Sequence, residues 1–145
     1  MINEFMRAAL DEARHGFDEG GVPIGAALVS SGKIIATGRN RRVQDGAPTM
    51  HAEMNCLYNA GGSLYGFDNL TLYTSLMPCY MCAGAVLQFG IMKVVAAEAR
   101  TANEGLEMMR QHGVEVIDLD ISESRELLAE YIRANPSGWH SYPPE

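Results

Sequence analysis

The sequence has few cysteines and lacks any long apolar run. Three of its 145 residues are cysteines. No segment approaches the roughly 20 apolar residues that a membrane-spanning helix needs. No internal repeat or low-complexity stretch is visible either. These absences exclude a membrane partner and a repeat architecture, and they favour a compact globular protein.

Basic residues are also scarce. Lys and Arg number 11 against 18 Asp and Glu, which gives a formal net charge of −7. Because attraction to nucleic acids depends largely on Lys and Arg displacing counterions from phosphates, this balance predicts no nucleic-acid partner. The one dense basic group is Arg39, Arg41 and Arg42, beside Asn40, and we interpret it as a solvated loop surface.

No export signal is visible at the N-terminus. Residues 1–4 provide neither a basic leader nor an apolar stretch, so we expect a cytoplasmic protein. The cysteine count is odd, and Cys79 and Cys82 form a Cys-x-x-Cys pair. In a cytoplasmic chain this spacing indicates metal or redox chemistry before a structural disulfide.

The chain length fits a single domain over residues 1–145. Apolar periodicity and glycine or proline punctuation predict the elements. The predicted helices are 3–17, 51–59, 80–89, 104–112 and 122–133. The predicted strands are 24–29, 33–38, 70–75, 91–97 and 114–118, and residues 40–49 are a polar loop. Strand–helix–strand units after residue 70 favour parallel pairing. The expected fold is an α/β protein, a three-layer α/β/α sandwich around a mixed five-stranded sheet.

Two short motifs together supply a set of metal ligands. One is His51-Ala52-Glu53, and the other is Pro78-Cys79-Tyr80-Met81-Cys82. Catalytic zinc sites use three nitrogen or thiolate ligands and keep the fourth position open, which His51, Cys79 and Cys82 satisfy. The alternatives are a redox pair and a structural zinc site. A structural site normally has a fourth protein ligand, and no further His or Cys lies at a compatible spacing.

Glu53 lies close enough to His51 to act on a metal-bound water without binding the metal itself. Both motifs are predicted at helix N-termini, where unpaired N–H groups and the helix dipole favour negative charge. Glu53 is therefore the candidate catalytic acid and base, the alternative being a solvated carboxylate in a first helical turn. The combination His-x-Glu with Pro-Cys-x-x-Cys is typical of zinc-dependent base deaminases.

The chain resembles the cytidine deaminase superfamily, and within it the fungal type of cytosine deaminase. The similar stretches are residues 19–25, 38–40, 50–53, 70–74, 78–85, 89–91 and Trp139. The metal motif alone indicates only the superfamily. Three further features narrow the resemblance to the branch that acts on free bases. They are the glycine-rich segment 19–25, Asn40 eleven residues before His51, and Trp139 near the C-terminus.

This resemblance implies one Zn²⁺ per chain, a homodimer and a buried substrate pocket. It implies that Asn40 and the backbone N–H of Ala52 bind the carbonyl edge of the base, and that Trp139 closes the pocket. An amide side chain suits a lactam edge because it offers both a donor and an acceptor. The alternative for Asn40 is a turn residue, and for Trp139 an aromatic side chain that covers the edge of the core.

Two positions depart from the fungal pattern, and both belong to the expected pocket. Tyr142 stands where the fungal type has an acidic residue three positions after the Trp. Thr101-Ala102 stands where it has a Phe against the ring. The smaller side chains of Thr101 and Ala102 are expected to enlarge the pocket. The phenol of Tyr142 is expected to change which N–H of the ring finds a hydrogen-bond acceptor. Cytosine is the first expected substrate, and the alternatives are an isomeric pyrimidine such as isocytosine, a triazine, guanine or a creatinine-like ring.

The sequence thus leads to one function and two competing ones. The first is hydrolytic deamination of a small amino-heterocycle, with release of ammonia. The second is deamination of adenosine in tRNA, which needs a basic surface and a way to hold an extruded base. The third is a zinc-stabilised interaction module without catalysis, which leaves Glu53 unexplained.

Overall fold

The computed structural model describes residues 2–139 of the chain. The helices are α1 (Glu4–Asp18), α2 (Arg42–Asp45), α3 (Ala52–Ala60), α4 (Tyr80–Gln88), α5 (Leu106–Gln111), α6 (Ser122–Ala134) and the 3₁₀ helix η1 (Gly61–Gly66). The strands are β1 (Gly25–Ser30), β2 (Lys33–Arg39), β3 (Leu70–Thr74), β4 (Lys93–Ala96) and β5 (Glu115–Asp118). None of the helices in this described part is long and apolar enough to cross a bilayer.

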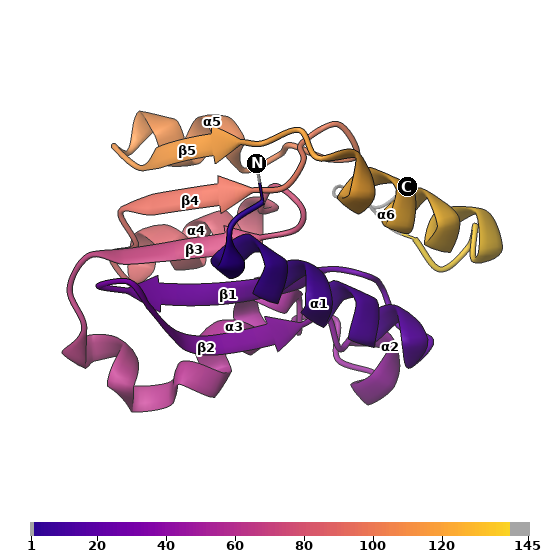
Figure 1. The fold of residues 1–145 in the computed structure, drawn as a ribbon, viewed down its shortest axis with the longest axis horizontal. Helices are drawn as coiled ribbons and strands as arrows, with labels where there is room; N and C mark the ends of the chain where they lie inside the picture. The colour runs from indigo at the N-terminus through magenta and orange to yellow at the C-terminus, as the bar shows by residue number, and fades with distance from the viewer. Residues whose placement is uncertain (1, 140–145) are drawn as a thin grey trace.

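The strands form one mixed sheet between two layers of helices (Figure 1). Its order is β2-β1-β3-β4-β5, with β1 antiparallel to both neighbours and β3, β4 and β5 parallel. Helix α1 covers one face, and α3, α4 and α5 cover the other. The predicted three-layer sandwich with a mixed five-stranded sheet is confirmed.

Period-two alternation sorts the strand side chains between two apolar cores. In β1, Leu28 belongs to the core under α3, α4 and α5, which contains Cys56, whereas Val29 belongs to the core under α1, which contains Met6. Every residue of β1 is buried, as expected for a strand covered on both faces. This burial holds the strand rigidly between its two neighbours.

Helix α1 is fixed at both its start and its contact with the sheet. The side chain of Asn3 accepts a hydrogen bond from the Met6 N–H at 2.9 Å, which caps one of the unpaired donors at the helix start. At Gly25 a Cβ would collide with the backbone of α1 at Ala9 and Ala13. Only glycine therefore allows α1 to approach the start of β1 this closely.

The segment 40–49, predicted as a loop, contains the short helix α2. The Asn40 side chain accepts a hydrogen bond from the Arg42 N–H at 3.0 Å, and Arg41 pairs with Asp45 at 2.8 Å. Gly46 ends the turn with a φ of 61°. The prediction that this segment is polar was correct, but the prediction of a loop without a helix was wrong. Local side-chain hydrogen bonds stabilise one helical turn there, and such a turn has no apolar periodicity by which to recognise it.

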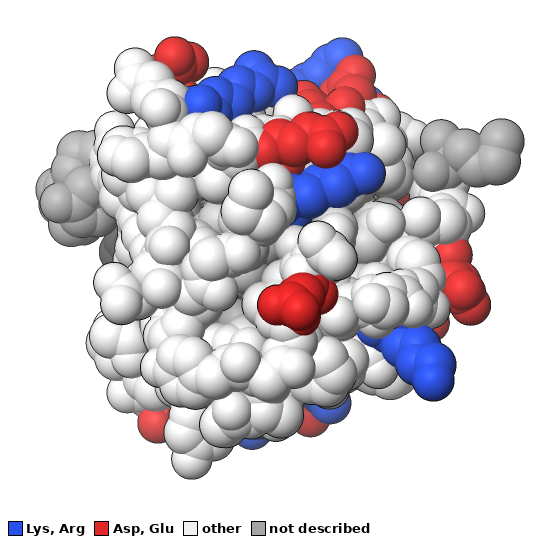
Figure 2. All heavy atoms as spheres, turned by 90° about the vertical axis from the view of Figure 1, so that its left-hand side faces the viewer, with Lys and Arg blue, Asp and Glu red and all other residues white. Residues whose placement is uncertain are grey.

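The two ends of the sheet differ in character. Figure 2 shows the end at which β3 and β4 begin, where charged side chains of both signs are few and scattered and no basic stripe gathers. At the opposite end β2, β3 and β4 finish and β1 begins. There the Ser75 N–H donates to the Gly25 carbonyl at 2.9 Å, which ties the end of β3 to the start of β1. The functional residues lie at this second end.

Candidate active site

Three side chains converge at the end of the sheet where β3 finishes. The Sγ atoms of Cys79 and Cys82 lie 3.4 and 3.6 Å from the Nδ1 atom of His51. All three ligand atoms lie within 4.8 Å of one another. A nitrogen and a sulfur bound to one tetrahedral zinc, at about 2.0 and 2.3 Å, are roughly 3.6 Å apart. The spacing of the three donors therefore fits a single zinc ion.

The helix starts hold these ligands in place. His51 is the N-cap of α3 and Cys79 is the N-cap of α4, each with an extended backbone and neither with a side-chain capping bond. Cys82 lies in the first turn of α4 and is fully buried. The ligands thus lie at the positive ends of both helices, which favours thiolates.

Hydrogen bonds among the two thiols and the imidazole shift their pKa values. The hydrogen bond with Cys82, and then that with His51, lowers the pKa of Cys79 to about 4. The same bond to Cys79, together with burial, raises the pKa of Cys82, and the Cys79 bond raises the pKa of His51. Two neighbouring thiols cannot both ionise without a compensating cation. A zinc ion bound by these three donors would supply that cation.

Glu53 lies on the first turn of α3, two residues after His51. The residue is 4% exposed, and it lines the same cavity as His51 and Cys79. Burial raises the pKa of Glu53 to about 7. A carboxyl group with this pKa can both accept and donate a proton near neutral pH, which is the requirement for a general acid and base.

The cavity over these residues measures about 680 Å³, within the usual range for small-molecule pockets. Its apolar wall includes residues that flank β1 and β3: Val22, Ile24, Leu76 and Met77. It lies outside the carboxyl ends of the parallel strands β3 and β4, the usual location of ligand sites in such sheets. The arrangement can hold a flat, mostly apolar ring beside a metal and a carboxyl group.

The residues predicted to bind substrate fall into three groups. Asn40 and Trp139 line the cavity, and so does Ala102. Ala52 is buried and is not among the described residues of the cavity wall, although its N–H lies at the first position of α3. Tyr142 lies outside the described residues.

Asn40 lies in a turn and also lines the cavity. The residue is 4% exposed, and its Oδ1 atom accepts the hydrogen bond from the Arg42 N–H, as in a turn. The Nδ2 group is then the part of the amide that can donate to a ligand in the cavity. An N–H donor at this position suits a carbonyl oxygen on the ring.

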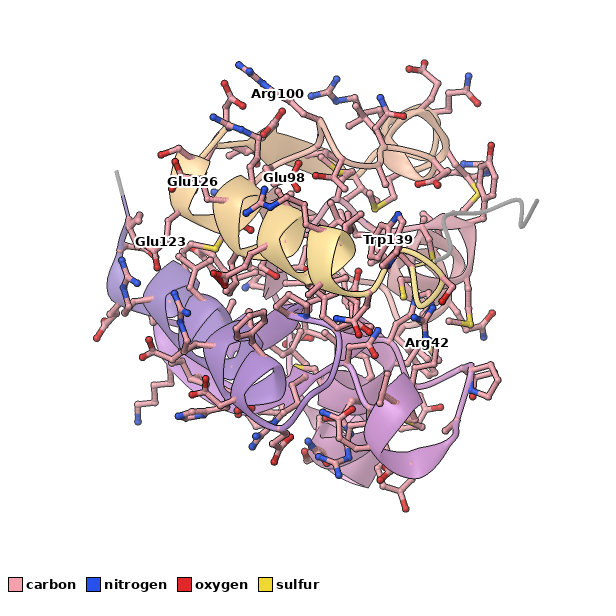
Figure 3. All side chains as sticks on the ribbon, turned by 90° about the vertical axis from the view of Figure 1, so that its right-hand side faces the viewer. Arg42, Glu98, Arg100, Glu123, Glu126 and Trp139 are labelled. Carbon is pink, nitrogen blue, oxygen red and sulfur yellow. The ribbon has the colours of Figure 1, made fainter. Side chains whose placement is uncertain are left out.

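The sequence analysis missed two charged side chains of the cavity wall, Arg42 and Glu104. Arg42 was interpreted as solvated, but its guanidinium donates to the carbonyl oxygen of Gly138, the residue before Trp139. Figure 3 shows Arg42 and Trp139 lying close together beside the end of α6. The only sequence signal for Arg42 was its position two residues after Asn40, and Glu104 belongs to no motif.

Comparison with known proteins identifies the family. Residues 1–98 match the cytidine and deoxycytidylate deaminase zinc-binding region. The chain belongs to this deaminase family. The deaminase is 37% identical to a cytosine deaminase from Candida albicans over 139 residues, which covers 93% of this chain and 91% of that protein. His51, Cys79 and Cys82 all lie within the matched region and form its possible metal site.

Other relatives act on purines. A tRNA-specific adenosine deaminase from Aquifex aeolicus is 32% identical over 139 residues, covering 89% of this chain and 92% of its own length. A solved guanine deaminase from Nitrosomonas europaea superposes with a TM-score of 0.77 at 28% identity, covering 88% of this chain and 82% of that one. The family and its zinc chemistry are therefore shown for the deaminase, whereas the relatives differ in the base they act on.

The bond from Arg42 to Gly138 gives a prediction for the tail. Trp139 is the only tryptophan of the deaminase, so its fluorescence reports on this segment alone. Arg42→Ala removes the donor to Gly138, and we expect red-shifted Trp emission with increased quenching by acrylamide. Arg41→Ala, which removes the neighbouring guanidinium but not this bond, is the control. Equal emission and quenching in the Arg42→Ala variant and the wild type would contradict the role assigned to Arg42.

Proposed function

We propose that this deaminase hydrolyses the amino group of a free nitrogen-heterocyclic base, with cytosine as the first candidate, and releases ammonia. The observation that carries the proposal is the cavity, in which His51, Cys79 and Glu53 share one largely apolar pocket with Asn40 and Trp139. Similarity to a cytosine deaminase over nearly the full length of both chains supports the same class of substrate.

Each residue has a distinct part in this reaction. His51, Cys79 and Cys82 hold the zinc. Bound there, zinc would supply the Lewis acid that activates water for attack near neutral pH. Glu53 accepts the proton of the water and passes protons to the ring nitrogen and to the departing amine. One C–N bond breaks and one C–O bond forms, so water and the amino compound give a carbonyl product and ammonia.

The remaining side chains bind and orient the ring. Asn40 donates from Nδ2 to the ring carbonyl, and the N–H of Ala52 supplies a second donor to the same edge. The apolar wall excludes water from both faces of the ring, and Trp139 covers it from the tail. Tyr142 stays a proposed contact of the substrate. Because Ala102 provides little bulk, the pocket also suits a bicyclic ring, and the similarity to a guanine deaminase makes guanine the second candidate.

We further propose that the deaminase forms a cytoplasmic homodimer and acts without a nucleic-acid partner. The resemblance to fungal cytosine deaminases supports the dimer. The net charge of −7 opposes attraction to phosphates, even though a tRNA-specific adenosine deaminase is among its relatives.

A substrate panel tests the proposed function. Zinc-loaded protein is incubated with cytosine, isocytosine, guanine, an amino-triazine, creatinine, cytidine and an anticodon stem-loop RNA, and ammonia is measured. We expect at least one free base to be hydrolysed with a kcat/KM of about 10⁴ M⁻¹s⁻¹ or more, as is usual for a natural substrate. Ammonia release from the RNA alone, or from none of the panel, would overturn the proposal.

A further inference from the structure

The loop after β4, residues 99–104, is held at its start by a buried carboxylate. Glu98 is fully buried, and its Oε2 atom accepts hydrogen bonds from the N–H groups of Arg100 at 2.8 Å and Thr101 at 2.9 Å. Its carbonyl oxygen accepts a third from the Met77 N–H at 2.9 Å. Figure 3 shows Glu98 and Arg100 on this side of the molecule. The loop therefore leaves the sheet in a fixed direction, beside the end of β3.

The far end of the loop is fixed against the turn that carries the metal ligands. The Gly105 N–H donates to the Pro78 carbonyl at 3.0 Å. A Cβ at Gly105 would lie 2.8 Å from the Cys79 carbonyl oxygen and 2.7 Å from the Ala83 side chain, so no larger residue fits. This contact places the preceding residue, Glu104, next to the turn at Cys79.

Glu104 has an acceptor atom that no residue in the described range 2–139 satisfies. Its side chain lines the cavity together with Ala102, and its Oε2 atom is buried without a hydrogen-bond partner among residues 2–139. The other carboxylate of the cavity, Glu53, already has a role at the metal. A buried carboxylate oxygen without a donor is costly, and ligand N–H groups are the donors that a binding pocket adds.

We propose that Glu104 is a substrate-binding residue that accepts a hydrogen bond from a ring N–H of the free base. This inference rests on the proposed function and narrows its substrate class. Asn40 supplies a donor and Glu104 an acceptor in the same cavity, so the pocket selects neutral rings that carry both a carbonyl oxygen and an unsubstituted ring N–H. A base alkylated or glycosylated at that nitrogen has no proton to donate, and its substituent meets the carboxylate.

The test compares a free base with its N-methyl counterpart. Glu104→Gln and Glu104→Ala are assayed on cytosine and 1-methylcytosine, and on guanine and 9-methylguanine. We expect kcat/KM for the accepted free base to fall about 10- to 100-fold, mainly through KM, the usual effect of losing a hydrogen bond to a charged group. For the methylated base kcat/KM falls less or rises, so the preference for the free base shrinks. Glu107→Gln, an exposed carboxylate on α5, is the matched control and retains wild-type values.

Zinc content and Tm, measured on all variants, separate substrate binding from structural damage. A kcat/KM within twofold of wild type in both Glu104 variants, or an equal loss for free and methylated bases, overturns the role of Glu104 and leaves the proposed function intact. If the wild type deaminates no free base, the proposed function fails, and this inference fails with it.

Discussion

Replacement of Glu53 by Gln is expected to lower kcat about 10³- to 10⁴-fold while one zinc ion per chain is retained. Positioned acid–base groups contribute roughly 10²- to 10⁴-fold, and Glu53 is proposed to serve more than one proton transfer. Glutamine keeps the shape of the buried side chain and cannot exchange the proton. Steady-state ammonia release gives kcat, and atomic emission gives the zinc content.

The control for this variant lies one turn further along α3. Cys56 is fully buried on the same helix and is not one of the three possible metal ligands, so Cys56→Ala tests for general damage to α3. We expect that variant to keep kcat within a few-fold of wild type. If Glu53→Gln retained wild-type kcat, the general acid and base would have to be another group, and a structural role for the metal would become the better interpretation.

Replacement of Cys82 by Ser should remove the zinc and lower the thermal stability of the zinc-loaded protein. Serine is nearly the same size but is a poor zinc ligand, and two ligands hold the ion much less firmly than three. A ligand present at about 1,000 times its dissociation constant stabilises the folded state by about 4 kcal/mol. For a domain of this size that corresponds to a fall in Tm of roughly 8–16 °C.

A chelator separates loss of the ion from loss of packing. EDTA should lower the Tm of the wild type toward that of Cys82→Ser and leave the variant unchanged. Cys56→Ala should behave like the wild type in this respect, since it leaves all three ligands in place. One zinc per chain in Cys82→Ser would show that the ligands are assigned wrongly.

The fold and the metal centre could be predicted because their signals are local. Alternating apolar residues identified the strands, and strand–helix–strand order indicated a parallel half of the sheet. His51 and the Cys79–Cys82 pair each lie at a helix start, so short spacings already place the donors at the N-terminal ends of α3 and α4. The structure then shows the three donors close enough to share an ion.

The charged residues on the substrate side of the cavity, Arg42 and Glu104, could not be predicted in the same way because distant segments bring them there. Arg42 and Gly138 are 96 positions apart in the chain, and no periodicity connects them. Glu104 reaches the cavity only because Gly105 contacts the turn at Pro78. The matched family region ends at residue 98, just before this loop. The possible metal ligands, Glu53 and Asn40 thus lie within the matched region, whereas Glu104 and Trp139 lie beyond it.

Because both ends of the loop after β4 are fixed, the side chains between them can be replaced together. Glu98 holds its start and Gly105 its end, and both use backbone groups that do not depend on the side chains between them. Positions 101–104 can therefore be randomised as a unit without moving a zinc ligand. For engineering, this makes the loop the natural place to build a library that retargets the enzyme to new rings while hydrolytic competence is inherited unchanged.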